Sequence, residues 1–235
     1  AEVGVRPVTD VEHRLGAEGG GHALQGKRGS ARILRRKATR RLIRDKFRNW
    51  HDPRMAIETG TLWTIGHSTR TWEVFEGMLR DAGIAVLADV RRFAGSRRNP
   101  QFSRDAMPDA LAGAGIRYWP LPALGGRRTV QPGSPNTAWR VDAFRAYADH
   151  LANPDYIAAR EALMATALRE RSCVMCAEAL WWRCHRRLIA DDFVARGWTV
   201  LHLLAPGKIE PHVLNPDAAM VDGVLRYPGP QPSLL

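Results

Sequence analysis

The feature that most constrains the fold is a regular alternation of short apolar segments and amphipathic segments, which begins at Leu62. Short apolar segments bounded by glycine or proline are typical of strands, and segments with apolar residues at every third or fourth position are typical of helices. Because the two kinds alternate, we expect parallel strand pairing through right-handed crossovers. The expected strands are 62–65, 84–90, 116–119, 172–176 and 198–203, and the expected helices are 72–82, 104–114, 141–151, 156–171 and 184–196.

This pattern predicts a single three-layer α/β domain with a mostly parallel sheet of about five strands and helices on both faces. The strand at 84–90 is almost wholly apolar, as strands covered on both faces are. We place the domain at residues 55–205, after a basic extension at 1–54 and before a C-terminal tail at 206–235 that is rich in proline and glycine. The pattern does not predict the order of the strands in the sheet.

The positive charge of the chain is concentrated in the N-terminal extension. Residues 1–54 hold 14 Lys and Arg against 6 Asp and Glu, which gives a net charge of +8 out of +11 for the whole chain. We expect this arm to be disordered or partly helical. Three interpretations are open: an arm that binds nucleic acid or another acidic surface, a solvated tail, and an upstream extension that precedes a start at Met55.

Hydropathy and cysteine usage bear on the compartment. No apolar run approaches the ~18 residues of a membrane span, and the N-terminus lacks the hydrophobic core of a secretory signal. The three cysteines cannot all pair, and two of them lie in one expected strand. We therefore expect a cytoplasmic protein with reduced thiols and no membrane partner; its oligomeric state is open.

Polar residues follow four of the expected strands. The carboxyl ends of parallel strands meet at one edge of a sheet, so these residues should share one cleft. They are Gly66, His67, Ser68 and Thr69 after the first strand, Asp89 and Arg91 after the second, Gly125 and Gly126 after the third, and Cys176, Glu178, Cys184, His185 and Arg186 after the fourth.

The order of these short motifs, GHST, DVR, LGG, CAE and CHR, resembles that of the domain-of-unknown-function-488 family over about residues 60–205. The resemblance implies a compact α/β domain and leaves its activity unassigned. Residues 179–183, Ala-Leu-Trp-Trp-Arg, depart from the polar linker expected there. Trp181 and Trp182 either stack on a base or sugar of a ligand, or pack over the core beneath a flap at 121–138.

Candidate catalytic residues are concentrated between residues 176 and 185. Cys184 is expected to open a helix beside cationic residues, where a thiol ionises more readily. Cys176 ends a buried strand, so it is either a second reactive thiol or a small core residue. Glu178 is a general acid or base, a partner that orients His185, or a plain ion-pair member.

An anion-binding site is expected at the same edge. Backbone N–H groups of the turn at Gly66, His67, Ser68 and Thr69 can cradle an anion. The arginines at 91, 92, 97 and 98 add positive charge, with Arg186 opposite. Gly125 and Gly126 either permit close approach of a ligand or turn the chain, and Asp89 completes the set. The alternative is that Ser68 and Thr69 only cap a helix and that the arginines are solvated.

Two sets of cysteine and histidine residues are possible metal ligands. Cys173 and Cys176 have zinc-like spacing, but residues three apart on a strand point to opposite faces. Cys176, Cys184, His185 and distant His67 form another possible set. Adjacent residues at a helix start diverge by about 100°, which disfavours joint binding by Cys184 and His185. We therefore assign no metal ligand, and the sequence leaves open whether a metal or other cofactor is bound.

The leading functional hypothesis is an enzyme that acts on a nucleotide, nucleic acid or similar anionic substrate at the carboxyl edge of the sheet. The reaction class is not assigned. Two alternatives stay open: a non-catalytic nucleic-acid-binding or regulatory module that uses the basic arm and the two tryptophans, and a thiol redox sensor that requires Cys176 and Cys184 within bonding distance.

Overall fold

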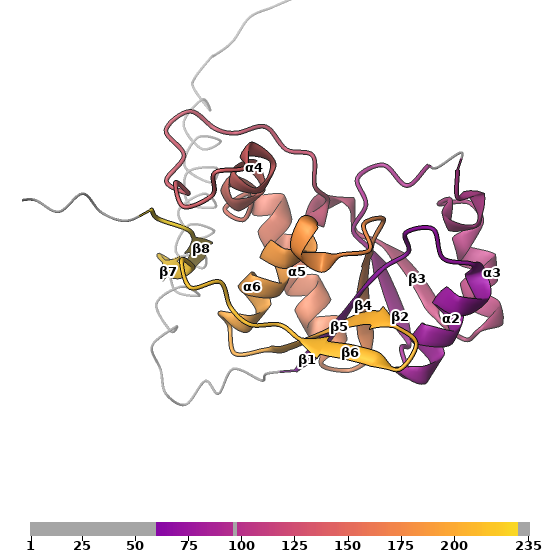
Figure 1. Ribbon diagram of the computed structural model, residues 1–235. Helices are drawn as coiled ribbons and strands as arrows, with labels where there is room; N and C mark the ends of the chain where they lie inside the picture. The colour runs from indigo at the N-terminus through magenta and orange to yellow at the C-terminus, as the bar shows by residue number, and fades with distance from the viewer. Residues whose placement is uncertain (1–59, 96–97, 230–235) are drawn as a thin grey trace, which may run out of the picture. The chain divides into compact units, whose positions relative to one another are not determined.

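The computed structural model describes residues 60–95 and 98–229 (Figure 1). The expectations for residues 1–54, Arg97 and 230–235 lie outside these ranges. Every predicted strand and helix is present, so the α/β class is confirmed. The strands are β1 (Thr61–Gly66), β2 (Val86–Asp89), β3 (Arg117–Pro120), β4 (Ser172–Cys176) and β5 (Thr199–Ala205), and the helices are α2 (Trp72–Asp81), α3 (Met107–Gly113), α4 (Asp142–His150), α5 (Pro154–Ala167) and α6 (Arg186–Val194).

The main sheet has six strands in the order β3-β2-β4-β1-β5-β6. The first five are parallel, and β6 (Lys208–Pro211) pairs antiparallel with β5. The register of the central pair sets Gly66 beside Cys176, so two of the predicted polar segments leave the sheet side by side.

Helices cover both faces of this sheet (Figure 1). On one face α2 and α3 pack on the side chains of Ile65, Cys173 and Met175. On the other face α4, α5 and α6 pack on Leu62, Val174 and Cys176, among others. The alternation of side chains along β4 therefore separates Cys173 from Cys176, and the prediction that these two cysteines face apart is confirmed.

The helix starts follow local chemistry. Thr71 accepts a hydrogen bond from the backbone N–H of Val74, so the predicted N-cap of α2 is confirmed. Asn153 caps α5 and Pro154 occupies its first turn. Ser103 accepts a hydrogen bond from Ala106 N–H, but α3 begins only at Met107, because a 3₁₀ turn at Pro100–Phe102 and a further turn come first.

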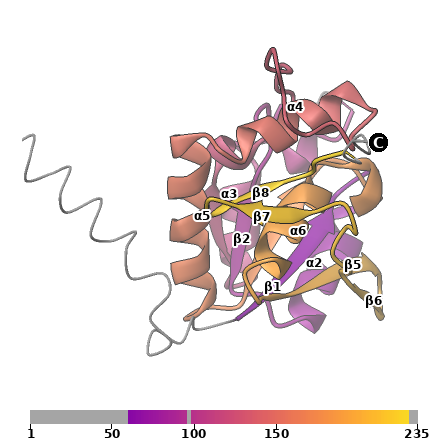
Figure 2. The same ribbon diagram turned by 90° about the vertical axis from the view of Figure 1, so that its left-hand side faces the viewer.

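The segment after β5 is not a surface tail. It forms β6 and then a hairpin of β7 (Ala219–Val221) and β8 (Val224–Arg226), which lies over the face that carries α6 (Figure 2). Tyr227 is fully buried, and its phenol donates a hydrogen bond to Asp191. The expectation of a tail at 206–235 is therefore wrong up to residue 229, because the buried side chains of Leu225 and Tyr227 complete the core despite the prolines and glycines.

Within the part of the chain that the structure describes, no helix is long and apolar enough to cross a membrane.

Candidate functional site

The site lies at the carboxyl end of β4, where the connections of neighbouring strands diverge. After β4 the chain passes to α6 on one face, whereas the flanking strands β1 and β2 lead to α2 and α3 on the other face. Such a switch point leaves a crevice that side chains or ligands can fill. Of the residues expected to share one cleft, three that follow β4 come together here: Cys176, Cys184 and His185.

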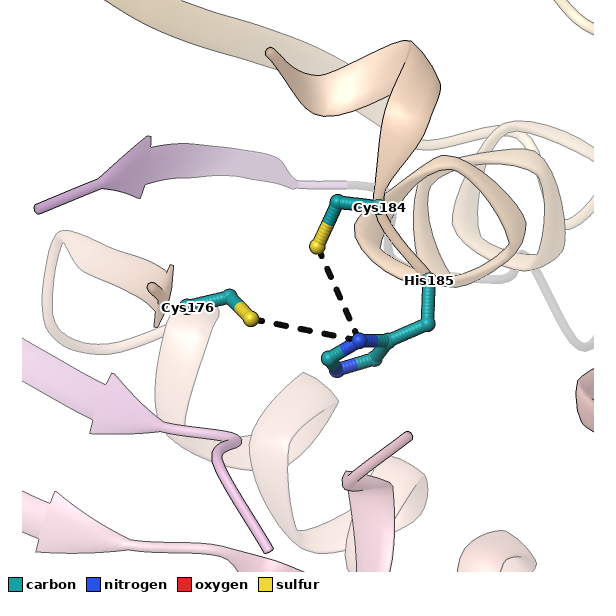
Figure 3. Close-up of side chains that lie close together, drawn as sticks. All are labelled: Cys176, Cys184 and His185. Atoms are coloured by element: carbon teal, nitrogen blue, oxygen red, sulfur yellow. Dashed lines mark hydrogen bonds between the residues drawn. The ribbon is translucent and has the colours of Figure 1, made fainter. Parts of the chain in front are cut away.

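Three reactive side chains converge in this crevice (Figure 3). The Sγ atoms of Cys176 and Cys184 lie 3.9 and 3.6 Å from the same atom, Nδ1 of His185. All three donor atoms lie within 4.8 Å of one another, and both cysteines are buried and free. Three of the four predicted catalytic residues are thus brought together.

The expectation that Cys184 and His185 diverge is wrong. α6 begins only at Arg186, and Cys184 has extended backbone angles, φ −126° and ψ 152°, at the end of a 3₁₀ turn (Trp181–Arg183). The 100° rotation between neighbours applies only when both residues are helical. An extended residue followed by the helix N-cap instead turns both side chains toward Cys176.

The two site cysteines differ in their tendency to ionise. A hydrogen bond from the Cys176 thiol to the Cys184 sulfur lowers the pKa of Cys184 well below its usual value, although burial opposes this, and the charges of His185 and Arg186 act in the same direction. On the opposite face of the sheet, burial raises the pKa of Cys173. Cys184 is therefore the more acidic thiol of this cluster, and Cys173 is a buried core thiol on the other face.

A buried arginine fixes the loop between the two site cysteines. Arg186 is 1% exposed, and its guanidinium donates to the carbonyls of Glu178 and Ala179 and to Thr64 Oγ1. Gly66 lies directly under this loop, and a Cβ at this position would overlap the Glu178 carbonyl. Arg186 therefore holds the protein backbone, and its charge acts on the cysteines from inside the fold.

The predicted residues His67, Asp89 and Arg91 form a separate buried cluster. Arg91 pairs with Asp89 at 2.7 Å and also donates to His67 Nε2 at 3.1 Å and to the Phe102 carbonyl. Desolvation lowers the pKa of His67 to about 4, so the ring is neutral at pH 7. The structure does not bring His67 to the cysteines; this cluster ties the loop at 91–102 to β2.

The turn after β1 does not present a free N–H cradle. His67 N–H and Ser68 N–H donate to the carbonyls of Cys176 and Ala177. Ser68 adopts a left-handed conformation, and Thr69 is exposed. Glu178 is also exposed, and the contact it makes with Arg186 is through its carbonyl. These residues support the cysteine loop instead of facing into the crevice.

The glycine pair lies between the cysteine cluster and a second polar region. A Cβ at Gly126 would lie 2.8 Å from His185 Nδ1, and a Cβ at Gly125 would lie 2.9 Å from Arg92. Arg92 and Arg128 line an open pocket of about 480 Å³ together with His150 and Asp149, whose carboxylate accepts hydrogen bonds from Ser134, Asn136 and the Gln131 N–H. Repulsion from Arg92 contributes, after desolvation, to a lowered pKa of Arg128. No carboxylate pairs with either arginine in residues 60–95 and 98–229, so the pocket is a candidate anion site.

A chain of buried hydrogen bonds went unpredicted. It begins at Arg186, which donates to Thr64 Oγ1, and Thr64 Oγ1 lies 2.7 Å from His202 Nδ1. The other ring nitrogen of His202, Nε2, lies 3.0 Å from His212 Nδ1. The chain ends where His212 Nε2 lies 2.8 Å from Asp191 Oδ1. Arginine only donates and a carboxylate only accepts, so when both imidazole rings are neutral every link is satisfied by groups that donate in the direction from Arg186 to Asp191.

The sequence carries a partial signal for this chain of hydrogen bonds. His202 interrupts an otherwise apolar strand, and a polar residue in a buried strand indicates a specific partner. Nothing marked His212, because it follows a proline in the segment taken for a tail.

The two tryptophans divide their roles: Trp181 stacks on His202 with ring centroids 4.3 Å apart, whereas Trp182 is 41% exposed.

The cysteine cluster can support three kinds of chemistry. An ionised sulfur beside an imidazole can act as a nucleophile with its base. Two thiols at this separation can form a disulfide after a small movement. Two sulfurs and a nitrogen that face one point can also hold a thiophilic metal ion.

Comparison with known proteins assigns the family. No curated protein and no solved structure matches the chain. One family model, described as domain of unknown function DUF488, matches residues 70–193, just over half of the sequence. The matched region runs from the start of α2 to the end of α6 and includes Cys176, Cys184 and His185. The chain therefore belongs to the DUF488 family.

Proposed function

We propose that this chain is an enzyme for an anionic substrate such as a nucleotide, with a reactive centre formed by Cys176, Cys184 and His185. The observation that carries the proposal is the convergence of two thiols and an imidazole on one point at the carboxyl edge of a parallel sheet. Sites of this kind collect at such edges because strand ends and loops converge there. On the grounds of hydropathy given above, we expect the enzyme to act in the cytoplasm.

The pocket of Arg92 and Arg128 supports an anionic substrate. The arginines are close enough to repel one another and have no acidic partner among the described residues, so a bound phosphate would relieve the repulsion. A Cβ added at Gly125 would lie against Arg92 and one added at Gly126 would lie against His185, so the glycine pair lies between the pocket and the reactive centre. The proposal moves substrate binding from the turn at Gly66–Thr69 to these two arginines.

The anion site is tested by calorimetric titration with inorganic phosphate, AMP and GMP. We expect wild-type protein to bind at least one of them and the variants Arg92→Gln and Arg128→Gln to bind at least about tenfold more weakly, as loss of a charged hydrogen bond implies. Arg98→Gln is the matched control, because Arg98 is exposed and does not line the pocket. Equal binding by all three variants would remove the substrate assignment.

The reactive centre is tested by turnover. Wild-type protein, Cys184→Ala and the control Cys173→Ala are incubated with the nucleotides that bind, and products are separated by chromatography. We expect turnover by wild type and Cys173→Ala and none by Cys184→Ala. Unchanged turnover in Cys184→Ala would exclude this centre.

A second candidate, a thiol redox sensor, is favoured by the separation of the two sulfurs, which is at most 4.8 Å. Hydrogen peroxide would oxidise the Cys184 thiolate to a sulfenic acid, and Cys176 would displace water to form a disulfide, with loss of two hydrogens from the protein. Mass spectrometry of peroxide-treated protein measures this loss. A Cys176–Cys184 peptide cross-link would support the sensor, and stable free thiols would exclude it.

A further inference from the structure

The three donor atoms have the spacing of a metal site. Zinc binds cysteine sulfur at about 2.3 Å and histidine nitrogen at about 2.0–2.1 Å, so donors in a tetrahedral site lie about 3.5–3.8 Å apart. The two sulfur-to-Nδ1 distances here are 3.6 and 3.9 Å. The two sulfurs lie within 4.8 Å of each other, so movements of about 1 Å or less would bring all three atoms onto one ion.

The same ring nitrogen faces both sulfurs. A neutral imidazole nitrogen has one lone pair, and two sulfurs point at the same Nδ1 (Figure 3). The three atoms surround one point, which is the place that a cation would take. On this basis we propose that Cys176, Cys184 and His185 bind one Zn²⁺ ion, with a fourth coordination position left open.

The surrounding structure holds the ligands before the ion arrives. His67 N–H binds the Cys176 carbonyl, Arg186 fixes the carbonyls of Glu178 and Ala179, and Gly126 leaves room for the His185 ring. A Cβ at Gly126 would displace that ring. Both thiols would lose their protons on binding, and two thiolates balance the charge of Zn²⁺.

Three ligands place the site among the open ones. Structural zinc sites are closed by four protein ligands, whereas catalytic sites keep one position for water or substrate. In residues 60–95 and 98–229, no fourth His, Cys, Asp or Glu joins this group. The inference rests on the proposed function for the role of the ion in turnover. In turnover the ion would lower the pKa of a water bound at the open position. Binding of the ion is measurable without any substrate.

The test uses the full chain purified without chelator. Elemental analysis should find about one zinc per chain, and titration of metal-free protein with Co²⁺ should give a thiolate-to-cobalt charge-transfer band and the visible bands of a tetrahedral ion. Cys176→Ser, Cys184→Ser and His185→Gln should each weaken zinc binding by more than about a hundredfold, since loss of even an indirect partner costs 10–100-fold.

Cys173→Ala is the matched control, because Cys173 lies on the same strand but faces α2 and α3. It should bind zinc as tightly as wild type does. The inference is overturned if wild-type protein gives no cobalt–thiolate band, or if Cys173→Ala loses it as well. Zinc binding without nucleotide binding would overturn the substrate assignment alone, and nucleotide turnover without zinc would overturn the metal site alone.

Discussion

Gly66 shows how a single absent side chain permits the site to form. It ends β1 beside Cys176, and the loop that carries Glu178 passes directly over its Cα. The same close approach brings the guanidinium of Arg186 to the loop carbonyls. A glycine is needed here for space, since its φ is not in the left-handed region.

We expect Gly66→Ala to destabilise the protein by about 3 kcal/mol or more, because the new methyl group would overlap a backbone carbonyl that cannot rotate away. Urea denaturation measures the change. Gly77→Ala is the control: Gly77 lies in α2 with no heavy atom within 4 Å of an added Cβ, and the substitution should stabilise the helix by about 0.5–1 kcal/mol. A neutral Gly66→Ala would contradict the account of this contact.

The individual site residues were only partly predictable. Sequence alone separated Cys173 from Cys176, since strand alternation is a local rule. The sequence did not predict that Cys184 and His185 converge. A 3₁₀ turn precedes Cys184, whose backbone is extended, and no sequence pattern indicated that turn. Sequence alone also assigned ligand contacts to Arg91 and His67, whose polar atoms bind each other and nearby carbonyls.

At the scale of elements, α6 organises the interior. Its first residue, Arg186, and Asp191 terminate the buried hydrogen-bond chain, which passes through Thr64 on β1 and His202 on β5. The neighbouring Asp192 pairs with Arg160 of α5 and with Arg196. α6 therefore contacts the sheet through a buried charged side chain, Arg186, as well as through its apolar residues.

Stability should depend on pH through His202. Desolvation, followed by the electrostatic effects of His212 and Arg186, lowers the pKa of His202 to about 3. The unfolded chain has a histidine pKa near 6.5 and therefore binds the proton first. The contribution of neutral His202 to stability is complete above pH 6.5 and falls as pH decreases toward 3, by up to about 1.4 kcal/mol per pH unit.

The measurement is the free energy of unfolding in urea between pH 7 and pH 4 for wild type and His202→Gln. We expect the slope against pH to be smaller in the variant by about one bound proton. Acid titration of carboxylates affects both proteins, so the difference isolates His202. Identical slopes would show that His202 is protonated in the folded protein.

At the scale of the whole described unit, the last strands close the core. Tyr227 packs against Trp139 and binds Asp191 through its phenol, and its backbone N–H donates to Asn136. These contacts join the β7–β8 hairpin to the segment before α4 and to α6. Residues far apart in the sequence therefore depend on one another for burial.

Tyr227→Ala should cost about 3–5 kcal/mol, because it empties a fully buried aromatic position. Tyr227→Phe should cost only about 1–2 kcal/mol, because it removes the hydrogen bond to Asp191 and keeps the ring. Both are measured by chemical denaturation. Similar values for the two variants would indicate that the hydrogen bond, and not packing, holds this segment.

The main alternation of strands and helices was predictable because it depends on the local spacing of apolar residues. The strand order was not, since it depends on which crossovers pack together after the chain returns from β3 to β4. The closing segment was missed for a similar reason: Leu225 and Tyr227 are few apolar residues among prolines and glycines, and only their distant partners make them core residues.

The buried chain from Arg186 to Asp191 also bears on how the protein can vary through evolution. Both ends lie on α6, yet the path between them runs through β1, β5 and the segment after β6. Substitution of one interior member would leave the buried polar groups on either side of it without that hydrogen-bond partner. Thr64, Arg186, Asp191, His202 and His212 should therefore be inherited as a set, kept together or replaced together in related sequences.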